Sequence, residues 1–419
     1  MCLVRRTAGV LGAITCVLAA VSARAQVDLI SASTVHGVVD VRAEAADGEP
    51  SFTSDGFGKG RYGGDGSSVT GGVQLANATL EWTPRFGWDW TAVVDVIAQP
   101  GQEHTVDLDQ AYLVFKPTPT SGTRFQARAG LFYPPVSLEN DFRAWGVTNT
   151  ITPSAIDSWI GEEVKVVGAE GKVTQDLGDQ KLSATLGVFS YDDTAGTLLS
   201  FRGWAVHDIQ SQANGSFDLP PRAPLLDHVQ SDESYSLLDI DNRAGVYGRA
   251  EWKTPDNLGL SVFYYDNRGD MTSVTPDHQW AWATHFLDLG LRWDADEKTT
   301  ILGQALEGRT VMGFQTPLGR FVDMDFRSAY LLATRLVGKS AFTGRLDLFD
   351  THDNSGLALG DTNERGWALT GAWRYPLNQF LDVRLEALHI FSDRPGRLLA
   401  DEAPDQSQTI LQSSLRLSF

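Results

Sequence analysis

The side chains that most often carry chemistry in enzymes are sparse in this sequence. Both cysteines, Cys2 and Cys16, lie near the N-terminus, and the eight histidines are scattered without a serine or a paired carboxylate at a catalytic spacing. The acidic stretch from Asp350 to Gly356 lacks the alternating ligands of a calcium loop and is typical of a turn rich in Asp and Asn. We therefore predict no enzyme, no metal site and no cofactor.

The charged residues, in contrast, follow a regular pattern. They alternate with apolar residues along segments of about ten residues, so that each segment has one polar and one apolar side. The segments 244–252 and 342–348 show this split. In a third segment, 381–391, the apolar side carries Leu381, Val383, Leu385 and Ala387, and the polar side carries Asp382, Arg384 and Glu386. A period of two indicates β-strands.

Sixteen such segments set the expected strands. They are 35–45, 73–83, 88–98, 106–116, 124–133, 163–175, 181–191, 243–254, 258–265, 280–293, 299–307, 321–337, 339–350, 364–375, 379–392 and 408–419. The connections after even-numbered strands are short, and those after odd-numbered strands are generally longer. The longest are 46–72, 134–162 and 192–242. This alternation is typical of a barrel that spans an outer membrane.

The composition supports a membrane barrel rather than another β-rich fold. A mean hydropathy of −0.18 excludes a bundle of apolar transmembrane helices. Hydrocarbon offers no partner to an unpaired peptide group, so a sheet that crosses a membrane must close on itself. A secreted β-sandwich or β-solenoid is the alternative, but a sandwich would not need an apolar side opposite so many charges. We predict an all-β fold, a transmembrane antiparallel β-barrel of about 16 strands.

Residues 1–25 have the composition of a signal peptide. Arg5 and Arg6 precede an apolar stretch from Ala8 to Ala20, and Ala23-Arg24-Ala25 forms a small-x-small cleavage pattern. Both cysteines and three arginines lie in this segment, so the mature chain, 26–419, has no thiol and its net charge falls from −19 to −22. Such a charge excludes a nucleic-acid partner. We expect export to the periplasm and cleavage after Ala25.

The last segment, 408–419, is the most specific local signal. Apolar residues alternate with mostly polar ones along it, and the chain ends on Phe419. This resembles the C-terminal strand of bacterial outer-membrane barrels, in which a final aromatic residue completes the assembly signal. Together with the signal peptide it predicts a location in the outer membrane of a Gram-negative bacterium, in contact with outer-membrane lipid and lipopolysaccharide.

Two further stretches carry a resemblance to a known family. Residues 130–140, Gly-Leu-Phe-Tyr-Pro-Pro-Val-Ser-Leu-Glu-Asn, resemble the segment of the phosphate-selective porin O and P family in which strand five enters the third loop. The stretch from Ser158 to Glu163 looks like the return into strand six of porin-like proteins from proteobacteria. The resemblance covers about thirty-five residues. It implies a homotrimeric porin whose third loop, 134–162 here, folds into the pore and narrows it.

The resemblance says less about selectivity. It implies anion preference only where inward Arg and Lys dominate the pore, and no residue match places such residues here. On the polar sides of the strands, cations and carboxylates nearly balance. The basic set is Arg42, Arg124, Arg128, Lys165, Arg243, Arg249, Arg292, Arg327, Arg335, Arg345, Arg384 and Arg416. The acidic set is Asp40, Glu44, Glu81, Asp89, Asp95, Glu163, Glu251, Asp288, Asp347, Asp382 and Glu386.

The acidic excess of the chain must then lie mainly in the loops. We expect 192–242, which is rich in aspartate, to be a long extracellular loop. Its charge either keeps an exposed loop soluble or forms a vestibule that concentrates cations.

The candidate pore-lining and constriction residues are charged groups of the 134–162 loop, its flanks and the strands. Loop carboxylates are expected to face wall cations such as Arg128, Arg249 or Arg345, which predicts a transverse field and a mild cation preference. The full set is Arg128, Glu139, Asp141, Arg143, Glu162, Glu163, Lys165, Arg243, Arg249, Arg345 and Arg384.

We expect the chain to give passive diffusion of small hydrophilic solutes and ions through a loop-narrowed aqueous pore. One alternative is a channel specific for phosphate, another oxyanion or a sugar. Another is a barrel that displays its long loops for adhesion or binding.

Overall fold

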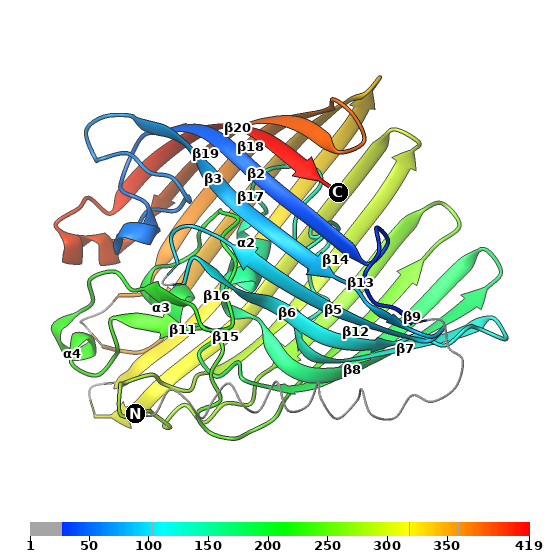
Figure 1. The fold of residues 1–419 in the computed structure, drawn as a ribbon. Coiled ribbons are helices and arrows are strands. Elements are labelled where there is room, and N and C mark those ends of the chain that lie inside the picture. The colour runs from blue at the N-terminus through cyan, green and yellow to red at the C-terminus, as the bar shows by residue number, and fades with distance from the viewer. Residues whose placement is uncertain (1–26, 103, 318, 358–360) are drawn as a thin grey trace.

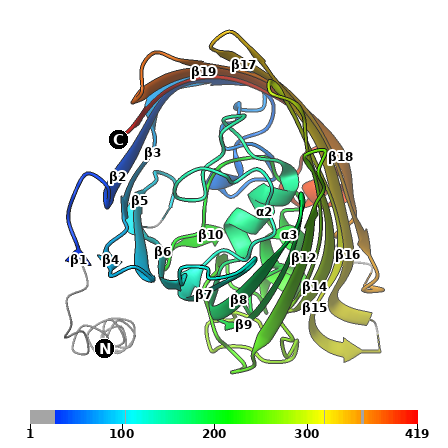
Figure 2. The same ribbon diagram turned by 90° about the vertical axis from the view of Figure 1, so that its right-hand side faces the viewer.

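The computed structural model describes residues 27–102, 104–317, 319–357 and 361–419, and the predicted signal peptide lies outside these residues. Sixteen long strands form one antiparallel sheet that closes into a barrel (Figures 1 and 2). They are β2 (Val35–Ala46), β3 (Thr70–Trp82), β5 (Trp90–Ala98), β6 (Val106–Phe115), β7 (Thr123–Phe132), β8 (Val166–Leu177), β9 (Gln180–Ser190), β12 (Gly245–Lys253), β13 (Leu258–Asp266), β14 (Ala283–Asp296), β15 (Thr299–Thr316), β16 (Gly319–Val337), β17 (Ser340–Asp353), β18 (Glu364–Pro376), β19 (Leu381–Asp393) and β20 (Asp405–Ser418).

The barrel closes because β2 pairs with β3 on one side and with β20 on the other. The backbone N–H of Gly37 donates to the carbonyl of Phe419, and the N–H of Phe419 donates to the carbonyl of Gly37, both at 3.0 Å. A Cβ at Gly37 would overlap the Phe419 ring, so only glycine leaves room for the terminal aromatic residue. The seam thus unites the first long strand with the last residue of the chain.

The remaining elements are short. In the barrel sheet, β1 (Val27–Asp28) pairs with β4 (Arg85–Phe86), and β10 (Ser216–Asp218) pairs with β11 (Glu233–Tyr235) in a separate ribbon. The helices are α2 (Ala155–Glu163), α3 (Thr197–Phe201), α4 (Pro224–Asp227), and the 3₁₀ turns η2 (Phe52–Ser54) and η3 (Pro395–Ala400). Over the described ranges, a helix with the length and apolar character needed to cross a membrane is not found.

The barrel prediction is confirmed, and each expected segment overlaps one strand. Most boundaries shift by at most three residues, and two of the differences have a clear cause. The expected strand at 299–307 continues to Thr316, because paired charges replace apolar residues on its outer side: Arg309 bonds Asp323 of β16 at 2.7 Å and 2.8 Å. The expected strand at 163–175 begins later, at Val166, because residues 155–163 form α2.

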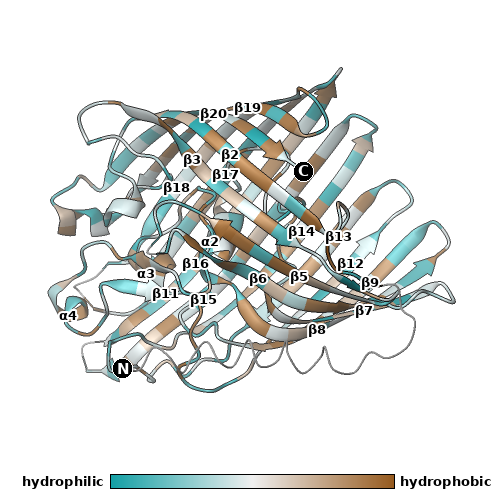
Figure 3. Cartoon of the chain, in the orientation of Figure 1, coloured by the Kyte–Doolittle hydropathy of each residue, from teal (hydrophilic) through white to brown (hydrophobic). Residues whose placement is uncertain are grey.

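The two faces of the strands differ as the alternation predicts. On β19, the outward Leu385 is 47% exposed, whereas the inward Arg384 is 3% exposed. Hydrophobic and hydrophilic residues alternate along the strands (Figure 3). The exposed apolar side chains belong to strands all around the barrel and form an apolar outer band. Two residues of the expected inward set were placed on the wrong side. Arg327 and Arg335 face outward, because the buried alternation of β16 runs through Phe326, Tyr330 and its even-numbered neighbours.

Long connections gather at one end of the barrel and short turns at the other (Figure 1). Several long connections turn back into the barrel rather than away from it, and α2 and α3 lie inside the ring of strands (Figure 2). The interior of this barrel is therefore shaped mainly by loop segments that pack on its inner wall.

Candidate functional site

The segment 134–165 enters the barrel and ends in α2. Ser154 caps the helix, since its hydroxyl accepts a hydrogen bond from the N–H of Asp157 at 3.3 Å. The sequence Pro153-Ser154 with Asp157 three residues later is a helix-start signal, but α2 has only nine residues, too few to show a long helical periodicity.

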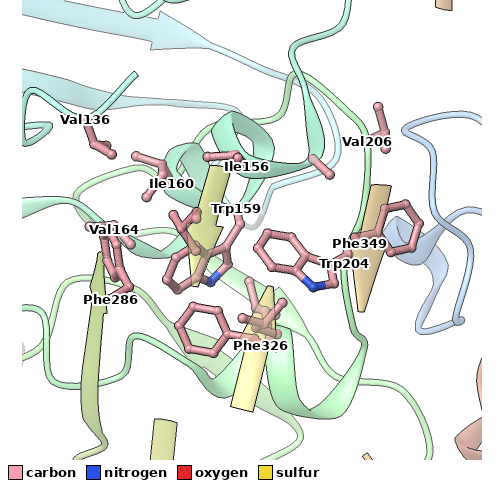
Figure 4. Close-up of a cluster of buried hydrophobic side chains, with 14 of the residues drawn as sticks. Val136, Ile156, Trp159, Ile160, Val164, Trp204, Val206, Phe286, Phe326 and Phe349 are labelled. Carbon is pink, nitrogen blue, oxygen red and sulfur yellow. The ribbon is translucent and has the colours of Figure 1, made fainter. Parts of the chain in front are cut away.

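An aromatic cluster fixes α2 to the inner wall (Figure 4). The ring of Trp159 lies 5.3 Å from Phe286 of β14, 5.1 Å from Phe326 of β16 and 5.9 Å from Trp204, measured between ring centres. All four side chains are at most 1% exposed. Such edge-to-face packing adds to the burial of large apolar surfaces, so α2 is held as firmly as a helix in a protein core.

Inward arginines bind the backbone of the same segment. Arg345 of β17 donates to the carbonyls of Thr152 at 2.7 Å and Pro153 at 2.8 Å. Arg384 of β19 donates to the carbonyls of Val147 at 3.1 Å and Thr150 at 3.0 Å. Arg416 of β20 also donates to Val147, at 3.1 Å. The wall cations therefore hold loop carbonyls and have fewer donors left for a passing solute.

Inward carboxylates complete this attachment. Glu386 of β19 accepts the N–H groups of Ile151 at 2.6 Å and Thr152 at 3.2 Å. Asp347 of β17 accepts the N–H of Ala155 at 3.1 Å. Both were expected on the inward side. Their role as acceptors for loop N–H groups depends on the path of the loop, and no local sequence pattern predicts that path.

The contact between Glu139 and Arg345 differs from the expected arrangement, in which loop carboxylates face wall cations across the pore. The two side chains meet at 3.2 Å, and both are at most 2% exposed. Glu139 also accepts the N–H of Ser154 at 2.8 Å. A loop carboxylate does face a wall cation here, but in direct contact, so no aqueous gap separates them and solutes cannot pass between them.

Glu162 and Glu163 are adjacent in α2 and lie in different environments. Arg202 binds Glu162 through two hydrogen bonds of 2.5 Å and 2.6 Å, and His207 lies 2.7 Å away. Burial opposes ionisation of Glu162, but Arg202 and His207 outweigh it and lower its pKa to about 2.

Glu163 accepts hydrogen bonds from Trp159 and from backbone N–H groups at the start of α3. Burial raises the pKa of Glu163 to about 7.

Three further candidate residues also contact the segment or its flanks. Arg128 of β7 forms an ion pair with Glu170 at 3.0 Å and donates to the carbonyl of Tyr133 at 3.1 Å. Lys165 binds Asp109 at 2.6 Å, and both side chains are fully buried. Arg249 of β12 donates to the carbonyl of Pro135.

Three candidates are not part of this buried attachment. Arg143 lies on the partly exposed portion of the segment and pairs with Glu81 of β3. Asp141 is exposed and forms no ion pair within the described part of the chain. Arg243 precedes β12, is 53% exposed and pairs with Asp270 at 3.1 Å, so it lies among the connections rather than on the inner wall.

The space beside the segment is narrow. A cavity of about 30 Å³ lies between the segment and the inner wall, lined in part by Asn77, Asn140, Trp145, Asp208 and Arg416. This volume is close to that of one water molecule. The segment therefore packs closely against this part of the inner wall, beside β3 and β20.

One acidic group could offer metal ligands among the residues the structure describes. Carboxylate oxygens of Asp193, Asp239 and Asp241 lie within 4.8 Å of one another. Asp193 already accepts the N–H groups of Ile240 and Asp241, and burial together with the neighbouring aspartates raises its pKa to about 6. Its carboxylate thus serves the fold of the 192–242 connection.

No protein-family model matches the chain, and no curated protein matches it in sequence. Solved structures do match. The outer membrane channel DcaP of Acinetobacter baumannii aligns with a TM-score of 0.56 and 10% identity, covering 95% of this chain and 99% of that one. An anion-selective porin from Comamonas acidovorans aligns with a TM-score of 0.51 and 11% identity, covering 94% and 100%. OmpF of Salmonella typhi, in complex with daunomycin, aligns with a TM-score of 0.51 and 9% identity, covering 94% and 97%.

These similarities show the fold, which is that of Gram-negative outer-membrane porins. The local resemblance to the phosphate-selective O and P family is not confirmed by these comparisons.

Proposed function

We propose that this chain is an outer-membrane porin that lets small hydrophilic solutes and ions diffuse through a pore narrowed by the segment 134–162. The observation that carries the proposal is a closed barrel with an apolar outer band, into which this segment folds and is bound by Arg345, Arg384 and Glu386. Passive diffusion needs no catalytic group, cofactor or metal, and only a polar inner wall of fixed width.

The proposal includes the setting of the pore. The signal peptide 1–25 directs export and is cleaved, the apolar band contacts outer-membrane lipid and lipopolysaccharide, and the long connections, 192–242 among them, face outward. Short periplasmic turns and long outer loops are typical of such barrels. Assembly as a homotrimer belongs to the same proposal.

A shortened loop tests the constriction. The N–H of Phe142 donates to the carbonyl of Gly146 at 3.0 Å, so the ends of this turn are close and the residues 142–146 can be removed with little strain. The contacts of Glu139, Val147 and Thr150 stay intact. In planar bilayers we expect the deletion variant to show a higher single-channel conductance in KCl than the unaltered protein. Equal conductance in a folded variant would argue against a constriction at this turn.

A loop-displaying barrel is the second candidate, because other segments also fill the interior. Lys59 binds Glu364 of β18 at 2.5 Å, and Asp208 binds Arg42 of β2 at 2.6 Å. These segments come from the long connections. Negligible conductance of the folded protein, with or without residues 142–146, would select this candidate.

A further inference from the structure

We propose that the wall formed by β3, β5 and β6 is a binding site for organic cations that carry a guanidinium or ammonium group, and that Arg143 is its built-in occupant. The inference rests on the proposed function, since it names the class of solute that this pore favours. It reverses the expected arrangement, because here a loop cation faces wall carboxylates.

The wall brings three carboxylates together. Glu81 of β3 and Asp95 of β5 are directly opposite each other in the strand register. Between β5 and β6 the register shifts at Asp95, so Asp109 is an extra residue in a β-bulge. Asp109 is fully buried and Asp95 is 1% exposed. The bulge therefore places Asp109 next to Asp95 on the inner wall.

Neighbouring side chains satisfy these two aspartates only in part. Lys165 binds one oxygen of Asp109 at 2.6 Å, and Gln110 donates to one oxygen of Asp95 at 3.1 Å. The other oxygen of each aspartate, Oδ1 of Asp95 and Oδ2 of Asp109, is buried without a hydrogen-bond partner in the described residues. A buried acceptor without a donor is costly, so these oxygens favour a ligand that brings N–H groups.

Arg143 shows what kind of group fits. Its guanidinium reaches across from the loop to pair with Glu81, while its side chain stays 37% exposed. The next two residues, Ala144 and Trp145, both have left-handed backbone angles, with φ of 49° and 56°. Two such residues in sequence are costly outside glycine, and this turn presents Arg143 towards the wall.

Aromatic rings complete the surroundings. The ring of Trp145 stacks on Tyr133 at 4.3 Å between centres, and the Nζ of Lys165 lies 4.4 Å from the centre of the Tyr133 ring. Tyr133 is buried and already contacts the Lys165 ammonium, so this ring shows that a cation fits beside the wall, and the carboxylates supply the acceptors for the N–H groups of a solute. A solute with such a group can replace Arg143 on Glu81, whereas a phosphate or a dicarboxylate is repelled.

Binding to the detergent-folded protein tests the site independently of conduction. The probe is methylguanidinium chloride, titrated by calorimetry into the unaltered protein, Arg143→Gln and the double variant Arg143→Gln, Glu81→Gln. Removing the Arg143 guanidinium leaves Glu81 free, so Arg143→Gln should bind methylguanidinium several-fold more tightly than the unaltered protein. The double variant should lose this increase in affinity. Asp95→Asn in the Arg143→Gln background is a second variant, should the first not fold. Equal affinity of Arg143→Gln and the double variants would overturn the inference.

Bilayer recordings relate the site to transport. With methylguanidinium chloride on one side and KCl on the other, Arg143→Gln should raise the permeability ratio of methylguanidinium to potassium several-fold, and Glu81→Gln should lower it. Arg327→Gln, an outward arginine paired with Asp350, is the matched control and should leave the ratio unchanged. If Glu81→Gln leaves the permeability ratio unchanged while KCl conductance persists, the cation-binding inference is overturned and the proposed function is not. Absence of KCl conductance with binding intact contradicts only the proposed function.

Discussion

Arg345 illustrates how a wall charge can serve the fold of the barrel interior. Its guanidinium contacts Asp347 at 2.8 Å, Glu139 at 3.2 Å and two loop carbonyls, and it is fully buried. Strand alternation predicted its inward direction. It could not predict these partners, because Glu139 lies 206 residues away along the chain. Residue identity gave the face of the strand, and the loop path decided the contacts.

Replacing Arg345 by leucine tests this role. The change leaves two carboxylates buried without their cation, and breaking one side of a buried ion pair costs about 3–5 kcal/mol. We expect lower stability to urea in detergent, followed by tryptophan fluorescence, and a higher or noisier conductance because the loop loses its attachment. Arg335→Leu, an exposed outward arginine paired with Asp296, is the control and should change stability by about 1 kcal/mol or less. Equal effects of the two substitutions would contradict the assigned role.

Glu163 predicts a pH dependence whose sign follows from its burial. In the unfolded chain this carboxyl ionises near pH 4.5, whereas in the folded protein its pKa is about 7. The folded state therefore holds an extra proton between these values, and stability present below pH 4.5 is lost as the pH rises to 7.

Glu163→Gln removes this contribution. Between pH 5 and pH 8 the unaltered protein should lose on the order of 3 kcal/mol more unfolding free energy than the variant. Urea unfolding at both pH values measures the difference, and the contributions of other titrating groups cancel between the two proteins. The same pH slope in both would show that Glu163 does not titrate in this range.

At the scale of elements, the strands could be predicted and the internal segment could not be traced. A two-residue period repeats in every strand, so each local stretch reports its own conformation. The path of 134–165 depends instead on distant partners such as Phe286 and Arg384. The local resemblance implied that this loop enters the pore, and the Ser154 cap indicates the start of α2, but neither gives the path of the loop.

Strand direction can be measured by cysteine labelling, because the mature chain predicted from the sequence has no thiol. Inward positions beneath the segment, such as Arg384, are unsuitable because they are covered. Lys172 of β8 and Glu251 of β12 are inward and about one third exposed, and they pair at 2.6 Å. Single cysteines at these two sites should react with a membrane-impermeant reagent in intact outer membranes.

The matched controls are the outward residues Val173 of β8 and Val262 of β13, each 41% exposed in the isolated barrel. Lipid should cover both in the membrane, so cysteines there should stay unlabelled until the protein is extracted into detergent. Labelling of all four positions in membranes would contradict the assignment of inner and outer faces.

At the scale of the whole molecule, charge distribution decides selectivity. The inner wall pairs most of its cations with carboxylates or loop carbonyls, as Arg128, Arg345 and Arg384 show. A paired cation contributes little field at a distance. The mature chain is expected to carry a net charge of −22, so the unpaired negative charge lies largely outside these pairs, in connections such as 192–242.

This distribution predicts a mild cation preference that depends on ionic strength. The Debye length is about 10 Å at 0.1 M salt and about 3 Å at 1 M, so acidic connections act across the mouth of the pore only in dilute salt. Reversal potentials across a fixed KCl ratio should therefore indicate cation preference at low concentration and decline towards zero preference at high concentration. Strong anion selectivity in dilute KCl would contradict this account and favour a channel for phosphate or another oxyanion.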